Sequence, residues 1–302
     1  MDYTLEQVRA VVAVADTGHF GRAAQSLSRT QPPLSRAVQK LEAAVGARLF
    51  ERTPRGAVLT AAGAAFLPHA RRLLAEAADA GAAAREAAAG RTGRVRVGFT
   101  VLAGLTVLGE HLAPAREHLP GVRLELEEAD SRAQLAALAA GTLDLGLVRG
   151  LPPGTDLRAR LVRSERLVAA VPAAHPLAGR ASVTLTDLAA HPLVTHSADL
   201  APALHRLVDA AFTAVGARPP VAATANQVHT LLALVDAGVG AAVVPAGVLR
   251  LRLDGVRYLE LDEGDGHRPD RHRAELFRVH RPDPAPALRA LLDVLPAGVS
   301  RA

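Results

Sequence analysis

The stretch that decides the fold runs from Phe20 to Phe50 and reads FGRAAQSLSRTQPPLSRAVQKLEAAVGARLF. It predicts two short helices joined by a tight polar turn, the second opening at Thr30-Gln31-Pro32. Ala23 and Ala24 allow close helix crossing, and apolar residues recur at helical spacing at Leu27, Leu34, Val38 and Leu41. The polar residues of the second helix fall on its other side: Gln31, Ser35, Arg36, Gln39 and Lys40. This layout is typical of a helix-turn-helix, whose second helix presents its first residues to base edges.

An ordinary helical hairpin that binds nothing is the alternative interpretation. Thr30 is a good N-cap residue and Pro32 suits a first helical turn, so the start of the second helix is sharply specified. Gln, Ser and Arg are also the side chains that pair with bases and phosphates. Residues 51–60 then predict a small hairpin, or wing, with arginines at its tip. We therefore favour DNA binding.

The run from Phe20 to Gly63 resembles the winged helix-turn-helix of LysR-type transcriptional regulators. The matching residues are Phe20, Ala23, Ala24, Leu27, Gln31, Ser35, Leu41, Glu42, Gly46, Leu49, Phe50, Arg52, Arg55, Leu59, Thr60 and Gly63. Departures are few: His19 and Thr30 stand where the family has Ser, and Val38 and Val45 replace Ile and Leu. His19 predicts a weaker cap for the first helix of the motif.

Charge and composition agree with a DNA-binding protein. The formal net charge is +5, and Lys40 is the only Lys, so nearly all basic residues are Arg. The absence of Cys excludes disulfides and thiolate metal sites. We see neither a signal peptide nor an apolar run of membrane length, and we expect a cytoplasmic protein without cofactors.

A long Ala-rich helix is predicted from about Ala61 to Ala89, ending at a Gly90–Gly93 hinge. Small and apolar residues recur at heptad spacing along this helix and just before it: Leu59, Gly63, Phe66, Ala70, Leu73, Ala77, Ala80 and Ala84. We call this row the heptad seam. The helix either lies on its own domain or pairs two copies of the chain, and we favour pairing. A paired recognition helix reads a near-palindromic operator on double-stranded DNA. The family resemblance implies a homodimer and a dimer of dimers.

The rest of the chain alternates strands and helices, which predicts mostly parallel sheets with right-handed crossovers. Strands are expected at 95–100, 122–128, 143–148, 165–171, 192–195, 221–225, 240–244, 256–261 and 274–279. Residues 139–147, 172–177 and 231–240 resemble the periplasmic-binding-protein-like effector domain of the same family. The expected fold is α/β, with an all-α-dominated N-terminal winged helix-turn-helix, a long linker helix and a two-lobed effector domain.

The expected domains are a DNA-binding domain at 1–60, a linker at 61–92 and an effector domain at 93–302. Within the effector domain, lobe one takes 94–163 and 269–302, and lobe two takes 164–268. The DNA contacts are expected from Arg29, Thr30, Gln31, Pro32, Ser35, Arg36, Lys40, Arg52 and Arg55. Among these, Gln31, Pro32 and Ser35 are expected to face bases.

A small-molecule effector site is expected between the lobes, because ligands of α/β sheets bind where strands end and helices begin. Residues at such places are Thr100, Val101, Ser131, His196, Ser197, Asn226 and Gln227. Arg149 follows a strand and is expected to make a bidentate contact with a carboxylate. The effector is therefore expected to be a small organic acid, although Asp130 is an unfavourable neighbour for one. Helix capping is the alternative role for Thr100, Ser131 and Asn226.

Other chemistry is less well supported. His267, His272 and His280, with Asp265 and Asp270, match no metal-binding spacing, and Arg268, Arg271 and Arg273 lie between them. No nucleophile elbow or phosphate-binding loop is present, so catalysis is not expected. The rival hypothesis is a small-molecule-binding protein or an enzyme whose N-terminal helices serve only assembly.

Overall fold

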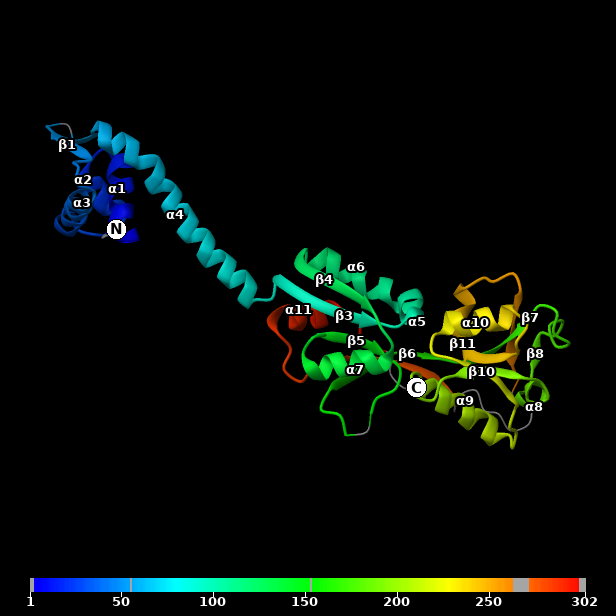
Figure 1. Cartoon of the computed structure of the whole chain (residues 1–302). Helices are drawn as coiled ribbons and strands as arrows, with labels where there is room; N and C mark the ends of the chain where they lie inside the picture. Colours follow the sequence, from blue (N-terminus) through cyan, green and yellow to red (C-terminus); the bar gives the residue numbers. More distant parts are fainter. Residues whose placement is uncertain (1–2, 55, 153, 263–271, 299–302) are drawn as a thin grey trace. The chain divides into compact units, whose positions relative to one another are not determined.

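The computed structural model describes residues 3–54, 56–152, 154–262 and 272–298. These residues form two compact units, Met1–Glu86 and Ala87–Ala302 (Figure 1). None of the described helices is both long enough and apolar enough to span a membrane.

Three helices form the core of the N-terminal unit: α1 (Leu5–Thr17), α2 (Phe20–Ser26) and α3 (Gln31–Val45). The predicted apolar stripe is buried at Leu34, Val38 and Leu41, whereas Leu27 is only partly buried. A Thr4–Gln7 capping box starts α1, and Gly18 ends it in the left-handed conformation at φ 64°. The helix-turn-helix predicted from the sequence is therefore present.

The structure shows a side-chain cap at α2 and corrects the prediction of one at α3. His19 does cap α2, because its Nδ1 atom accepts the backbone N–H of Gly21 at 3.0 Å. Thr30 stands at the N-cap of α3 but its side chain makes no capping hydrogen bond. A cap accepts from the second or third helical N–H, and here those residues are Pro32 and Pro33, which have no N–H to donate.

The wing is an antiparallel hairpin of β1 (Phe50–Thr53) and β2 (Gly56–Leu59). A side chain from α3 fixes its start: Glu42 Oε1 accepts the backbone N–H of Leu49 at 2.7 Å and that of Phe50 at 3.1 Å. Helix α3 and the wing beside it are thus joined by a carboxylate.

Helix α4 (Ala61–Ala88) carries the predicted heptad seam, but the seam is divided between two environments. Its first part packs on the core of its own unit, where Gly63 and Ala70 are buried and Phe66 is partly buried. Further along, Leu73 is 42% exposed, and Ala80 and Ala84 are exposed. The prediction that one continuous seam pairs two copies is therefore wrong for the first part of the helix.

The C-terminal unit contains a first sheet with strand order β4-β3-β5-β13-β6. These strands are β3 (Thr92–Phe99), β4 (Gly121–Glu128), β5 (Leu145–Val148), β6 (Arg158–Glu165) and β13 (Ala274–His280). β3 runs parallel to β4 and β5, and β13 is antiparallel to β5 and β6. Its helices are α5 (Val101–Ala103), a π-helical turn (Gly104–Leu108), α6 (Gly109–His118), α7 (Ser131–Ala140) and α11 (Pro286–Val294).

A second sheet has the order β11-β7-β12-β8, and a parallel pair of strands, β9 and β10, lies beside it. The strands are β7 (Leu167–Pro172), β8 (Ser182–Val183), β9 (Leu193–His196), β10 (Val221–Ala225), β11 (Ala242–Pro245) and β12 (Val256–Leu261). The helices are α8 (Leu185–Ala189), α9 (Pro202–Ala214), α10 (Val228–Asp236) and a 3-10 helix (Ala246–Arg250).

The predicted strand 165–171 corresponds to β7, except that Glu165 is the last residue of another strand, β6. β6 ends at Glu165 in the first sheet, and β7 begins at Leu167 in the second. β6 and the short β8 were not predicted. Residues 158–172 are extended almost throughout, and their sequence pattern does not say that the chain changes sheets at Arg166.

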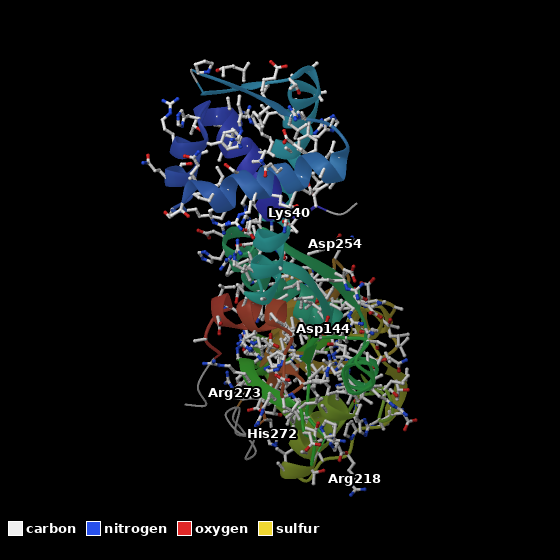
Figure 2. The ribbon with its side chains drawn as sticks, turned by 90° about the vertical axis from the view of Figure 1, so that its left-hand side faces the viewer. Lys40, Asp144, Arg218, Asp254, His272 and Arg273 are labelled. Atoms are coloured by element: carbon white, nitrogen blue, oxygen red, sulfur yellow. The ribbon has the colours of Figure 1, made fainter. Side chains whose placement is uncertain are left out.

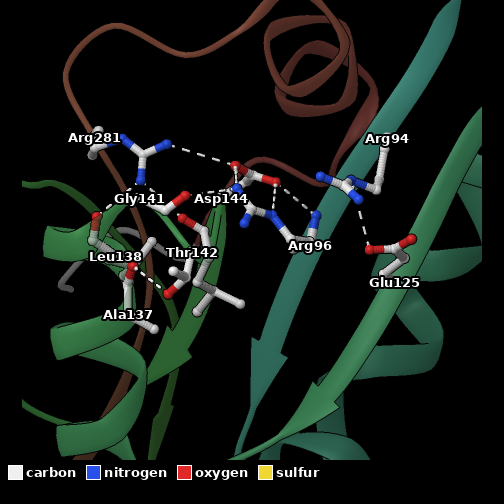
Figure 3. A network of polar contacts seen from close by, with 10 residues as sticks. Arg94, Arg96, Glu125, Ala137, Leu138, Gly141, Thr142, Asp144 and Arg281 are labelled. Carbon is white, nitrogen blue, oxygen red and sulfur yellow. Dashed lines mark hydrogen bonds and ion pairs between the residues drawn. The ribbon is translucent and has the colours of Figure 1, made fainter.

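An ion-pair network joins the three central strands of the first sheet (Figure 3). Asp144, just before β5, accepts from Arg96 of β3 at 2.9 Å and lies 3.6 Å from Arg281, which follows β13. Burial acts to raise the pKa of Asp144, but the hydrogen bonds and charges of the two arginines outweigh it, so this pKa lies below its usual value. The network holds β3, β5 and β13 in register.

Gly63→Ala should destabilise the N-terminal unit, because a Cβ atom there would overlap the carbonyl oxygen of Leu49, which is backbone and yields little. Overpacking of this kind costs about 1–3 kcal/mol of unfolding free energy or more. The matched control is Gly81→Ala in the same helix, where the nearest atom is the flexible end of Arg85 at 3.4 Å. That change should stabilise the helix by up to about 1 kcal/mol. Urea denaturation followed by circular dichroism measures both, and equal effects would contradict the close approach.

Candidate nucleic-acid interface and ligand cavity

The start of α3 presents its polar side chains outward. Gln31, Pro32, Arg36 and Lys40 are exposed and Ser35 is partly buried. Figure 2 shows Lys40 on the surface of the N-terminal unit. Within the described residues, Gln31, Arg36 and Lys40 have no side-chain hydrogen bond or ion pair. Their donors and charges are free to meet a partner.

The remaining expected DNA contacts differ in how free they are. Arg29 forms an ion pair with Glu6, which holds the pKa of that carboxyl below its usual value. Arg52 is exposed, and its guanidinium carbon lies 4.7 Å from the centre of the Phe20 ring. Arg55 lies outside the described residues. Arg29 is therefore a weaker candidate for a phosphate contact than Arg36, because its charge is already compensated.

A cavity of about 390 Å³ opens within the C-terminal unit between the first sheet and the β9–β10 pair. Six predicted residues line it: Thr100, Ser131, Arg149, His196, Asn226 and Gln227. Two predicted residues do not. Val101 packs on the apolar core around α10, and Ser197 forms the turn before α9, where its Oγ accepts from the Leu200 N–H at 3.4 Å.

Sequence reasoning missed most of the cavity wall. Its apolar part includes Leu102, Leu135, Leu151, Leu200, Leu204 and Val228, and two exposed arginines, Arg132 and Arg206, also line it. Several of these residues lie on α7 and on or before α9, where their apolar character is that of any amphipathic helix. Only the fold shows that the two segments face one space.

The capping alternative holds for one of its three residues. Thr100 caps α5, accepting from the Ala103 N–H at 3.3 Å. Asp130, not Ser131, caps α7, while Ser131 Oγ accepts the backbone N–H of Arg149 at 2.9 Å. Asn226 precedes the N-cap residue of α10, Gln227, which makes no side-chain cap. The hydroxyl hydrogens of Thr100 and Ser131 stay available as donors in the cavity.

Arg149 lines the cavity, and the two terminal nitrogens of its guanidinium group bind other parts of the protein. Its side chain is 5% exposed, its Nη2 is paired with the carboxylate of Glu165, and its Nη1 donates to the carbonyl oxygen of Ala274 at 3.2 Å. Only its Nε lacks a partner among the described residues. The terminal nitrogens thus already bind protein groups, and the predicted bidentate contact with a ligand stays a prediction.

His196 is the most isolated polar side chain in the cavity. It is 1% exposed, and neither ring nitrogen has a hydrogen-bond partner among the described residues. Burial lowers the pKa of His196 to about 4, and the charges of Arg149 and His205 contribute. The imidazole is therefore neutral at pH 7.

Comparison with known proteins decides the family. Residues 5–64 match the model "Bacterial regulatory helix-turn-helix protein, lysR family", and residues 88–299 match "LysR substrate binding domain". The chain belongs to the LysR family of transcriptional regulators. It is thus a DNA-binding regulator with a small-molecule-binding domain, and its α/β fold with an N-terminal helix-turn-helix is the family fold, as predicted.

Relatives match over nearly their whole length. The chain is 39% identical to the transcriptional regulator IlvR of Caulobacter vibrioides, over 96% of this chain and 97% of that protein. It is 35% identical to the regulator YnfL of Escherichia coli, over 93% and 98%. The crystal structure of the LysR regulator CbnR has a TM-score of 0.82 at 28% identity, covering 97% of this chain and all (100%) of CbnR. CbnR has also been solved in complex with its target DNA, with a TM-score of 0.80. These relatives are transcriptional regulators.

The histidine-rich segment weighed as a metal site falls mostly beyond the described residues. Asp265, His267 and Asp270 belong to the undescribed stretch 263–271. His280 is described, and its Nδ1 lies 2.6 Å from the Arg281 carbonyl oxygen.

Glu165→Leu should cost about 3–5 kcal/mol of unfolding free energy, because it leaves the Arg149 charge buried without its partner. The double variant Arg149→Met, Glu165→Leu removes both charges and should recover most of that loss. Denaturant unfolding of the two single variants and the double variant measures this coupling. Simple addition of the two single losses would show that the pair is not energetically linked.

Proposed function

We propose that the first turn of α3 reads operator bases through Gln31, Pro32 and Ser35. Thr30, Arg36, Lys40, Arg52 and Arg55 then hold phosphates or the minor groove. The exposure of the α3 start is the observation that carries this proposal. Because Pro32 and Pro33 remove two N–H groups from the helix terminus, side chains must supply most of the donors there. The Thr30 hydroxyl is free for this role, since it caps nothing.

We further propose that the exposed part of α4 pairs two copies of the chain. Leu73 is a large exposed apolar residue, and Ala80 and Ala84 follow it at heptad spacing on a surface with little bulk. A homodimer carries two recognition helices and matches a near-palindromic operator. Association of two such dimers is the assembly that we propose on the regulator's full site.

For the effector we propose a small organic acid bound in the cavity. The cavity offers hydroxyl donors from Thr100 and Ser131 and positive charge from Arg132 and Arg206, around an apolar wall. A ligand held there contacts both groups of strands and favours one angle between them. Because the ligand binds one angle between the groups of strands more tightly than another, it shifts the equilibrium between them. Helix α4 then transmits this change to the recognition helices. The expected domain limits, 1–60, 61–92 and 93–302 with its two lobes, belong to this proposal.

The competing hypothesis, an enzyme or binding protein whose N-terminal helices serve only assembly, leaves the free polar start of α3 without a role. We propose that the protein has no catalytic activity and works in the cytoplasm, where bacterial DNA lies. The support is that its full-length relatives are transcriptional regulators.

Gln31→Ala should relax base discrimination by about 1–3 kcal/mol at the position that this residue reads. The measurement is sequence selection from a random DNA pool, followed by mobility shifts on the selected site and its base variants. Gln39→Ala, an exposed Gln two turns further along α3, is the matched control and should keep the preference. An unchanged preference in Gln31→Ala would remove this residue from the reading surface.

Arg36→Ala should weaken specific and random DNA alike, lowering the slope of log affinity against log salt by about one unit. Arg29→Ala should lower it less, because Glu6 already compensates the Arg29 charge. Titration of a labelled duplex at several salt concentrations gives both slopes. If Arg29→Ala had the larger effect, Arg29 would leave Glu6 for a phosphate on binding.

A further inference from the structure

His196 carries hydrogen-bonding capacity that the protein does not use. It ends β9, its side chain is 1% exposed, and it lines the cavity. Neither Nδ1 nor Nε2 has a partner among the described residues. A neutral imidazole has one donor and one acceptor, and leaving such a group unsatisfied in a buried place is unfavourable. The ring borders the cavity and both nitrogens are themselves buried, so a molecule in the cavity satisfies them once the ring shifts toward it.

The charged groups around this imidazole come from each element that borders the cavity. They are Arg149 after β5 with its partner Glu165 of β6, His205 and Arg206 of α9, and Asp130 and Arg132 at the start of α7. Around β10 and α10, the residues at the cavity wall are the uncharged Asn226, Gln227 and Val228. Burial, then Arg149, then His205 lower the pKa of His196 to about 4. Positive charge therefore prevails beside an imidazole that is itself uncharged.

We propose that His196 receives the acidic group of the cavity ligand and takes up a proton from solvent as the ligand binds. This rests on the proposed function of the cavity as the effector site. An anion within a few ångströms stabilises the imidazolium, because opposite charges in a buried site interact strongly. It also offsets the effect of Arg149 on the ring. The proton goes to a ring nitrogen, and no covalent bond is made or broken.

The direction of the pH dependence follows from this. Binding raises the pKa of His196 above its free value of about 4. Above the raised pKa no proton is taken up, and the affinity for the ligand does not change with pH. As the pH falls through that value, affinity rises by up to tenfold per pH unit, because one proton is bound more tightly in the complex. The gain levels off near the free value.

The test is isothermal titration calorimetry on the full-length protein between pH 5.5 and 8. The probes are benzoate, phenylacetate and adipate, each beside its uncharged carboxamide. Repeating each titration in buffers of different ionisation enthalpy gives the number of protons taken up. We expect a carboxylate to bind with an uptake that grows toward one as the pH falls, and its carboxamide to bind without uptake.

Two variants show whether His196 is the group that takes up the proton. His196→Gln keeps hydrogen-bonding groups but does not titrate, so the rise in carboxylate affinity at low pH and the proton uptake should both be lost. His229→Gln, an exposed position on α10 outside the cavity wall, should keep the wild-type pH dependence. An uptake that persists in His196→Gln would assign the proton to another group, such as His205, whose charge acts on His196, and would overturn the proposal.

The remaining outcomes separate this inference from the proposed effector class. Carboxylate binding with no proton uptake at any pH would overturn the role of His196 and leave the acid-binding cavity standing. If none of the carboxylates bound, both the acid class and the proton-coupled role would fall. Resonances of the His196 ring, assigned by comparison with His196→Gln, give a second readout. Titration of that ring near pH 6.5 in the free protein would also contradict the proposal.

Discussion

The buried ion pair between Arg149 and Glu165 is the constraint on which the C-terminal unit depends. Glu165 is the last residue of β6, and its register partner Ala274 is the first of β13. Arg149 binds both, through the Glu165 carboxylate and the Ala274 carbonyl oxygen. A side chain at the end of β5 thus holds the place where β6 leaves the first sheet and β13 enters it. Gly247 packs so closely on Glu165 that any Cβ there would overlap its carboxylate. Position, charge and packing agree at one point, and the cavity opens beside it.

The buried polar groups near the Arg149–Glu165 ion pair differ in whether they have hydrogen-bond partners. Gln134 is as buried as His196, yet its amide donates to the Ala129 carbonyl oxygen at 2.8 Å and accepts the Leu147 N–H at 3.0 Å. The Arg149 Nε and both His196 nitrogens have no such partner among the described residues. Since a buried polar group without a partner is destabilising, its place in a fold is informative. Here the unmet groups lie at the wall of a cavity, which is where a ligand supplies what the chain does not.

Local patterns were enough to predict what local physics decides. The second helix of the N-terminal motif was expected to open at Thr30-Gln31-Pro32, and α3 begins at Gln31. The change of sheet between β6 and β7 could not be predicted from the sequence, because it depends on which distant strand offers hydrogen bonds on each side of Arg166. The same reason explains Arg149: its partners stand 16 and 125 residues away along the chain. Six residues at the cavity were found because strand ends are local features, while its apolar wall exists only once α7 and α9 face each other.

The two binding surfaces of this regulator depend on opposite electrostatic conditions. At the start of α3, charges and amides stand in water, where they are easily accommodated and where a polyanion gains by displacing counterions. The Pro32–Pro33 pair adds to this, since it removes N–H groups that would bind any anion and leaves side chains as the main donors of the proposed reading surface. In the cavity, Arg149 and His196 are held out of water, so each interacts strongly with whatever enters and tolerates few alternatives. An exposed surface suits a long, repetitive partner that must be scanned, and a cavity with buried polar groups suits a small molecule that must be distinguished from similar ones. Because both sites lie in one chain, binding of a small effector can control binding to DNA.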